Sequence, residues 1–128
     1  MLASPFGMAL AAATIAAGRT PVPQLIVGRP TQVKAQQQPP IGADMLDGLR
    51  SMMRMVVTSG TAKELGDCCG DVRGKTGEAE FNGGSHAWFA GYRGDLAFAS
   101  LIVGGGSSEY AVRMTKVMFD ALPPGYLA

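Results

Sequence analysis

The sequence carries little charge of either sign, and its charges are balanced. There are 11 lysines and arginines against 10 aspartates and glutamates, which gives a net charge of +1. The basic residues are scattered along the chain and do not gather into a patch. Because proteins that bind a phosphate backbone need clustered lysine and arginine, this composition argues against nucleic acid as the main partner.

Cysteine is scarce as well, because Cys68 and Cys69 are the only two and are adjacent. Two thiols are too few for a structural zinc site. Disulfides usually join Cα atoms about 5.5 Å apart, so a bond between neighbours would strain the peptide between them. We therefore expect two loop cysteines without a catalytic role, or one that pairs with a cysteine outside this chain.

The start of the chain lacks the features of a targeting segment. No lysine or arginine precedes the apolar run at residues 8–17, whereas a signal peptide has a basic start. The run is also shorter than the roughly 20 residues that span a bilayer. We expect a buried helix here, with Ser4 as N-cap, Pro5 in the first turn and Gly18 at its end.

Residues 19–41 contain five prolines and predict an extended connector, in which a short strand at residues 25–27 is possible. A second helix should follow, with Asp44 near its start. Its predicted apolar face follows helical spacing. That face comprises Met45, Leu49, Met52 and Val56, while Asp47, Arg50 and Arg54 are expected in solvent.

Three strands are predicted at residues 72–81, 87–92 and 96–103, joined by turns at 82–84 and 93–95. A last helix should begin at Ser107 or Ser108 and end before Pro123. Its expected polar stripe is Glu109, Arg113, Lys116 and Asp120, opposite an apolar face of Tyr110, Met114, Val117, Met118 and Ala121. The predicted fold is α+β, a three-stranded antiparallel meander with flanking helices in a single domain.

This arrangement leaves one strand poorly protected. The apolar run at 96–103 should be buried on both faces, yet the chain offers no obvious strand to pair with its free edge. An open apolar edge promotes aggregation. We expect either the segment at 25–27 or strands outside this sequence to cover it.

A Lys-Thr-Gly triplet, Lys75 to Gly77, stands at the head of the first predicted strand. A phosphate-binding loop would require another glycine five residues before Gly74, and that position is Cys69. The motif would also have to open a helix, but a hairpin turn follows. The spacing and the context therefore both exclude a phosphate loop.

A serine hydrolase built on the single histidine is also disfavoured. His86 follows Ser85 directly, and neighbouring residues on a strand point to opposite faces. The sequence has no G-x-S-x-G elbow. We expect His86 to have a structural role or none.

Lys-Thr-Gly is also one element of the active site of penicillin-binding proteins and serine β-lactamases. On a strand that lines a cleft, Lys75 supplies charge and Thr76 a hydroxyl donor to a substrate carboxylate. Gly77 lets an acyl group approach the backbone closely. The backbone N–H of Glu78 could then donate to the oxyanion that forms during acyl transfer.

The resemblance extends over most of the chain. "GKTGEAEF", "HAWFAGY", the apolar strand, the glycines and the last helix resemble the end of the transpeptidase domain of class B penicillin-binding proteins. "ASPFGMALAAATIAAGRTPVPQLI" resembles the family's stretch upstream of Lys-Thr-Gly, and "VVTSGTAKEL" its V-x-x-G-T-A segment. The details are most similar to actinobacterial penicillin-binding lipoproteins.

This resemblance implies a serine acyl-enzyme mechanism, D-Ala-D-Ala stem peptides as substrates and β-lactams as covalent inhibitors, without a metal or cofactor. In that scheme Lys75, Thr76 and Gly77 bind the substrate, and the Glu78 N–H forms half of the oxyanion hole. It also implies an extracytoplasmic, membrane-anchored protein, although this chain shows neither an anchor nor a signal peptide. Where the family usually has threonine, this chain has Glu78, which puts the side-chain contact there in doubt.

Two other family elements are missing from the sequence. No serine has lysine three residues on, and the S-x-N element is absent. We therefore expect residues 1–128 to be the C-terminal segment of a transpeptidase domain whose N-terminal part, including its first strands, lies upstream. By itself the chain should be catalytically inactive. An inert or merely docking fragment, a D,D-carboxypeptidase and a β-lactamase-like sensor remain alternatives.

Overall fold

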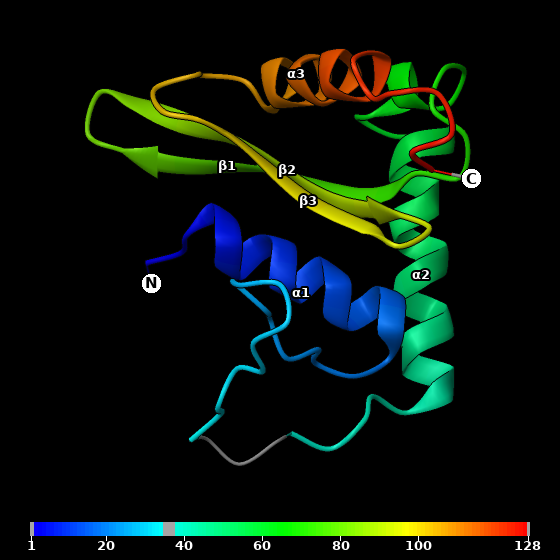
Figure 1. The fold of residues 1–128 in the computed structure, drawn as a ribbon. Coiled ribbons are helices and arrows are strands. Elements are labelled where there is room, and N and C mark those ends of the chain that lie inside the picture. Colours follow the sequence, from blue (N-terminus) through cyan, green and yellow to red (C-terminus); the bar gives the residue numbers. More distant parts are fainter. Residues whose placement is uncertain (1, 35–37, 128) are drawn as a thin grey trace.

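The computed structural model describes residues 2–34 and 38–127. These residues form three α-helices, one short 3-10 helix and three strands (Figure 1), which confirms the predicted α+β class. In chain order they are α1 Pro5–Ala17, α2 Ala43–Thr58, η1 Lys63–Leu65, β1 Arg73–Phe81, β2 Gly84–Arg93, β3 Leu96–Ile102 and α3 Ser108–Asp120.

The strands form an antiparallel sheet in the order β1-β2-β3, so the predicted meander is confirmed. β2 starts three residues earlier than predicted, because Gly84 already pairs with Phe81. The two hairpins turn at Gly83 and Gly94, whose φ angles are 99° and 53°. Glycine reaches this left-handed region without the clash that a Cβ would cause.

The sheet is covered on both faces. α3 packs on one face and α1 on the other, while α2 runs beside β1 (Figure 1). The main core lies between the sheet, α3, η1 and the end of α2. Its buried members are Val57, Ala62, Leu65, Cys69, Val72, Ala87, Phe89, Phe98, Ala111, Val112 and Phe119.

α1 begins and ends as predicted, but the expectation of a buried helix is only partly correct, because Ala12 alone among its residues is fully buried. The Ser4 hydroxyl accepts the Gly7 N–H at 3.1 Å, and Gly18 ends the helix with a φ of 75°. In the part of the chain that the structure describes, no helix combines the length and apolar character needed to cross a bilayer. The possible strand at residues 25–27 is wrong: this segment bends and turns, and Leu25 and Val27 are exposed.

The predicted inner face of α2 is only partly correct. Leu49 and Val56 are half-buried, but Met45 and Met52 are exposed, and the fully buried side chains are Met53 and Val57. The helix is rotated relative to this prediction, and two of its arginines turn inward toward backbone carbonyl groups.

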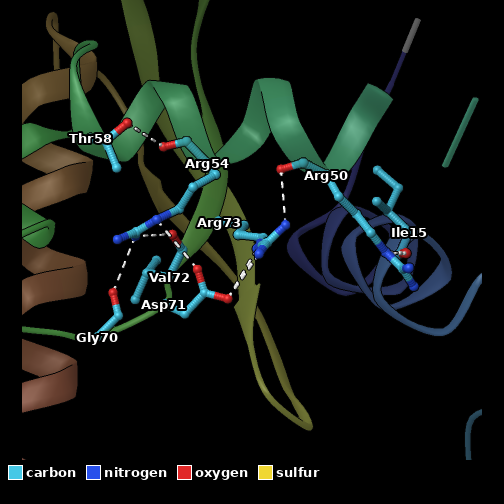
Figure 2. A network of polar contacts seen from close by, with 8 residues as sticks. All are labelled: Ile15, Arg50, Arg54, Thr58, Gly70, Asp71, Val72 and Arg73. Atoms are coloured by element: carbon cyan, nitrogen blue, oxygen red, sulfur yellow. Dashed lines mark hydrogen bonds and ion pairs between the residues drawn. The ribbon is translucent and has the colours of Figure 1, made fainter. Parts of the chain in front are cut away.

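Arg50 and Arg54 were expected in solvent, and that expectation is wrong. Arg50 donates to the carbonyl oxygens of Ile15, at 3.2 Å, and Ala16, at the C-terminal end of α1. Arg54 donates to the carbonyl oxygens of Gly70 and Val72, at 3.1 and 2.9 Å (Figure 2). These bonds join α2 to α1 and to the loop before β1.

The apolar face of α3 also differs from its prediction. Tyr110, Met114 and Val117 are exposed, whereas the buried side chains come from the adjacent stripe. That stripe consists of Ala111, Val112, Thr115 and Phe119. The N-cap is Ser107, as predicted, and the polar stripe carries the ion pairs Arg113–Glu109 and Lys116–Asp120.

A buried hydroxyl pair explains how α3 is oriented. Thr115 Oγ1 donates to the Ala111 carbonyl at 2.8 Å and lies 2.7 Å from Ser100 Oγ of β3. Since the only hydroxyl proton of Thr115 is used, Ser100 donates to it. The one polar residue of β3 is thereby satisfied.

Removing one member of this pair should cost more than removing both. We expect Thr115→Val to lower the free energy of unfolding by about 1–3 kcal/mol, because the Ser100 hydroxyl is left buried without a partner. The double variant Ser100→Ala/Thr115→Val should recover part of that loss. Urea unfolding of the four proteins measures the coupling, and purely additive effects would contradict the assignment.

β3 is an edge strand in the described residues. None of its side chains is exposed, because α1 covers one face and α3 the other. The expected burial on two faces is therefore confirmed in part, since only Phe98 and Ser100 are fully buried.

The two cysteines lie in a loop, as expected, but the expectation that they would not bridge each other is wrong. Cys68 and Cys69 are joined by a disulfide, although their Cα atoms are only 3.7 Å apart. Residues 66–71 form consecutive turns and bends, whereas in an extended chain neighbouring side chains would point apart. Cys69 is buried in the core.

Candidate functional site

The Lys-Thr-Gly triplet lies on β1, an edge strand of the sheet in the described residues. Lys75 faces Ala90, Thr76 faces Phe89 and Gly77 faces Trp88 across the β1–β2 ladder. Only one edge of β1 is paired, so within the described residues its other edge is open. An open edge next to polar side chains is suited to an extended peptide.

Lys75 lies on the face of the sheet that α1 and α2 cover. It borders an apolar hollow of about 420 Å³ between these helices and the sheet, together with Met8, Ile15 and Met52. Its side chain is exposed, and Nζ donates to the Thr76 carbonyl oxygen at 3.0 Å. The ammonium group is therefore bent toward the main chain of the triplet.

Thr76 points to the opposite face, as successive strand residues do. Its Oγ1 lies 2.8 Å from Thr61 Oγ1, in the loop between α2 and η1. Sequence reasoning did not predict this partner, although Thr61 belongs to the Gly-Thr-Ala triplet that resembles a family segment.

Gly77 has room for a side chain. A Cβ built there would meet only Trp88 Cβ, at the ordinary contact distance of 3.7 Å, and its φ lies outside the left-handed region. Neither packing nor backbone conformation therefore requires glycine at this position.

The carboxylate of Glu78 is directed at α3. Its Oε1 accepts the backbone N–H of Ser108 at 2.9 Å, at the first residue of the helix. A carboxylate is favourable there because it satisfies a free N–H group and faces the positive end of the helix dipole. Glu78 and Thr61 line a small hollow of about 360 Å³ on this side of β1.

Ser85 and His86 do not form a catalytic pair. Ser85 is buried and donates to the Gly106 carbonyl at 2.6 Å. His86 Nδ1 accepts the Gly104 N–H at 3.0 Å, and its ring stacks on Phe81 with centroids 4.6 Å apart. Both side chains hold the turn after β3, which agrees with the structural role expected for His86.

Sequence reasoning also missed a charged cluster beside the triplet. Arg73, two residues before Lys75, forms an ion pair with Asp71 at 3.0 Å, and Asp71 also pairs with Arg54 at 3.3 Å (Figure 2). The hydrogen bond to Asp71 raises the pKa of the Arg73 guanidinium above its already high usual value. Arg73 and Asp71 are two residues apart, but the contacts that bring α2 into the cluster join residues 16 to 23 positions apart, so no local pattern predicts it.

Comparisons with known proteins agree with this fold. The sequence profile of the family described as penicillin binding protein transpeptidase domain matches residues 1–121. None of the curated proteins matches the chain. The D,D-transpeptidase domain of a peptidoglycan glycosyltransferase from Eggerthella lenta has a similar fold, with a TM-score of 0.50 and 23% identity. The match covers 70% of this chain but 25% of that one, so this chain spans about a quarter of that protein's length.

Proposed function

Because this chain belongs to the penicillin-binding protein transpeptidase domain family, we propose that β1 forms one wall of a peptidoglycan D,D-transpeptidase cleft. The observation that carries the proposal is the Lys75-Thr76-Gly77 triplet on a strand with an open edge in the described residues. The substrates would be D-Ala-D-Ala stem peptides, and β-lactams would act as covalent inhibitors. We place this chemistry outside the cytoplasmic membrane, in a membrane-anchored protein.

Each residue of the triplet has a role in this cleft. The Lys75 ammonium and the Thr76 hydroxyl bind the carboxylate of the terminal D-Ala. Their present partners, a backbone carbonyl and the Thr61 hydroxyl, are uncharged and can be exchanged for the substrate. The backbone N–H of Glu78 donates to the oxyanion. The Glu78 carboxylate remains hydrogen-bonded to the Ser108 N–H of α3, away from the anionic substrate.

The nucleophile must come from elsewhere. No serine of this sequence has lysine three residues on, and Ser85 and Ser100 are buried and hydrogen-bonded. We propose that the serine of the S-x-x-K element, and with it the opposite wall of the cleft, belongs to a segment of the same domain outside this sequence.

Labelling with a fluorescent penicillin tests the proposal. We expect no covalent label on this chain alone, and a label on a longer protein expressed from the reading frame extended upstream of Met1. In that protein Lys75→Met should reduce labelling about a hundredfold, because the ligand carboxylate loses its cation. Lys34→Met, at an exposed position of the connector between α1 and α2, is the matched control. Labelling of the isolated chain, or equal effects of the two variants, would reject the proposal.

A substitution at Gly77 can distinguish a role in acylation from a role in folding. Gly77→Ala should leave the free energy of unfolding within about 0.5 kcal/mol of the wild type, because space exists for the methyl group. In the longer protein the same change should slow acylation by penicillin about a hundredfold, since the methyl group would displace the acyl group from the backbone. Urea unfolding and labelling rates measure the two effects. Loss of stability without loss of labelling would show that Gly77 is a structural residue.

A further inference from the structure

A second polar cavity, of about 640 Å³, lies where α1 ends and where α2 meets the start of β1 and the end of β2. It has a different lining from the hollows beside Lys75 and Glu78. Its charged and polar wall is made of Asp47, Arg50, Arg54, Asp71, Arg73 and Tyr92. Three guanidinium groups against two carboxylates leave this wall with one surplus positive charge.

Arg73 occupies the centre of this wall. Figure 2 shows Arg50 and Arg54, four residues apart on α2, on either side of its guanidinium. Arg73 Nε and Nη2 donate to Asp71, at 3.2 and 3.0 Å, and Nη1 donates to the Arg50 carbonyl at 3.4 Å. Asp71 also pairs with Arg54, so one carboxylate is shared between two cations.

The arginines keep donors that the described part of the chain does not use. A guanidinium has five N–H groups. Arg50 uses two of them on the end of α1, and Arg73 uses three. The side chains of Arg54 and Arg73 are only 28% and 29% exposed. Partly desolvated guanidinium groups with free N–H donors favour carboxylate and phosphate groups, which they can bind through two parallel hydrogen bonds.

The Tyr92 hydroxyl indicates a ligand in this cavity independently of the arginines. It lies directly opposite Arg73 in the β1–β2 ladder, and its side chain is 7% exposed. Its hydroxyl is buried beside the Arg73 guanidinium, where it contributes to the raised pKa of that group, but it makes no hydrogen bond of ordinary geometry among the described residues. Since buried hydroxyl groups are nearly always hydrogen-bonded, this one calls for a partner in the cavity that it lines.

We propose that this cavity binds a small oxyanion, a carboxylate or a phosphate, at the Arg73 guanidinium and the adjacent Tyr92 hydroxyl. Arg50 and Arg54 flank the ion and supply the surplus charge. Asp47 lines the same cavity and forms none of the ion pairs found in the described residues, so its carboxylate opposes the bound anion.

Titration of the full chain tests the site. Inorganic phosphate and acetate are each added at constant ionic strength, with sodium chloride as reference, and two-dimensional NMR follows the backbone amides of Arg73 and Tyr92. Saturable shifts with phosphate alone identify a phosphate site, and saturable shifts with acetate alone identify a carboxylate site. If chloride produces the same shifts, or if neither anion saturates, the proposal is wrong.

Two conservative variants test the assignment. Asp47→Asn should tighten anion binding about threefold, because it removes an opposing charge, whereas Asp44→Asn on the same helix but outside the cavity should not. Tyr92→Phe should weaken binding about tenfold without loss of stability, since its hydroxyl gives up no bond within the described residues. Tyr110→Phe on α3 is its control. Equal anion binding by each variant and its control would contradict the proposed site.

Discussion

Phe89→Ala is expected to be the most destabilising single substitution considered, at about 3–5 kcal/mol. The side chain is fully buried in the main core. Its ring lies 5.8 Å from that of Phe98, which in turn meets Phe119 at 5.4 Å, so one aromatic series joins β2, β3 and α3. Domains of this size are stable by only about 5–15 kcal/mol, so the loss approaches the whole stability.

Urea unfolding followed by far-ultraviolet circular dichroism measures this effect. Phe81→Ala is the matched control, because Phe81 is on the same meander but 46% exposed, and it should cost no more than about 1 kcal/mol. If the two variants were equally stable, the main core would not lie where the structure has it.

Gly91→Ala is expected to have the second largest effect, about 3 kcal/mol or more. Gly91 is paired with Gly74, and a Cβ at Gly91 would lie 2.2 Å from the Arg73 carbonyl oxygen. That oxygen belongs to the backbone and cannot rotate away. β1 must therefore shift, and Lys75 shifts with it.

Chemical denaturation should show the loss, and NMR shifts of the β1 amides should show that the strand has moved. The control is Gly77→Ala on the same ladder, whose Cβ has ordinary contact distances. A Gly91→Ala protein as stable as this control would mean that the two backbones are farther apart than the structure has them.

The sequence predicts the features that depend on neighbouring residues. Ser4 and Ser107 cap their helices, and Gly83 and Gly94 turn the hairpins, because each acts through groups a few residues away. The Lys-Thr-Gly triplet is likewise predicted to lie on a strand, because the Asn82-Gly83 turn follows a few residues later.

The faces of α2 and α3 could not be predicted in the same way. Both helices carry more than one apolar stripe, and the choice between them depends on distant partners. Thr115 is buried because Ser100 lies opposite, and Arg50 turns inward because α1 ends beneath it. The partners of the site residues are equally distant: Thr61 for Thr76 and Ser108 for Glu78.

The packing of α1 on β3 has a consequence for how the chain folds. The meander and α3 are continuous in sequence, so their contacts close short loops, whereas α1 reaches β3 from about eighty residues away. α1 contributes a single fully buried side chain, Ala12, and its remaining links include the Arg50 bonds to its last turn. The small apolar surface that α1 buries therefore offsets only part of the entropy cost of closing this long loop. We therefore expect α1 to dock last and to detach first, and its departure would expose the hollow beside Lys75 before the core melts.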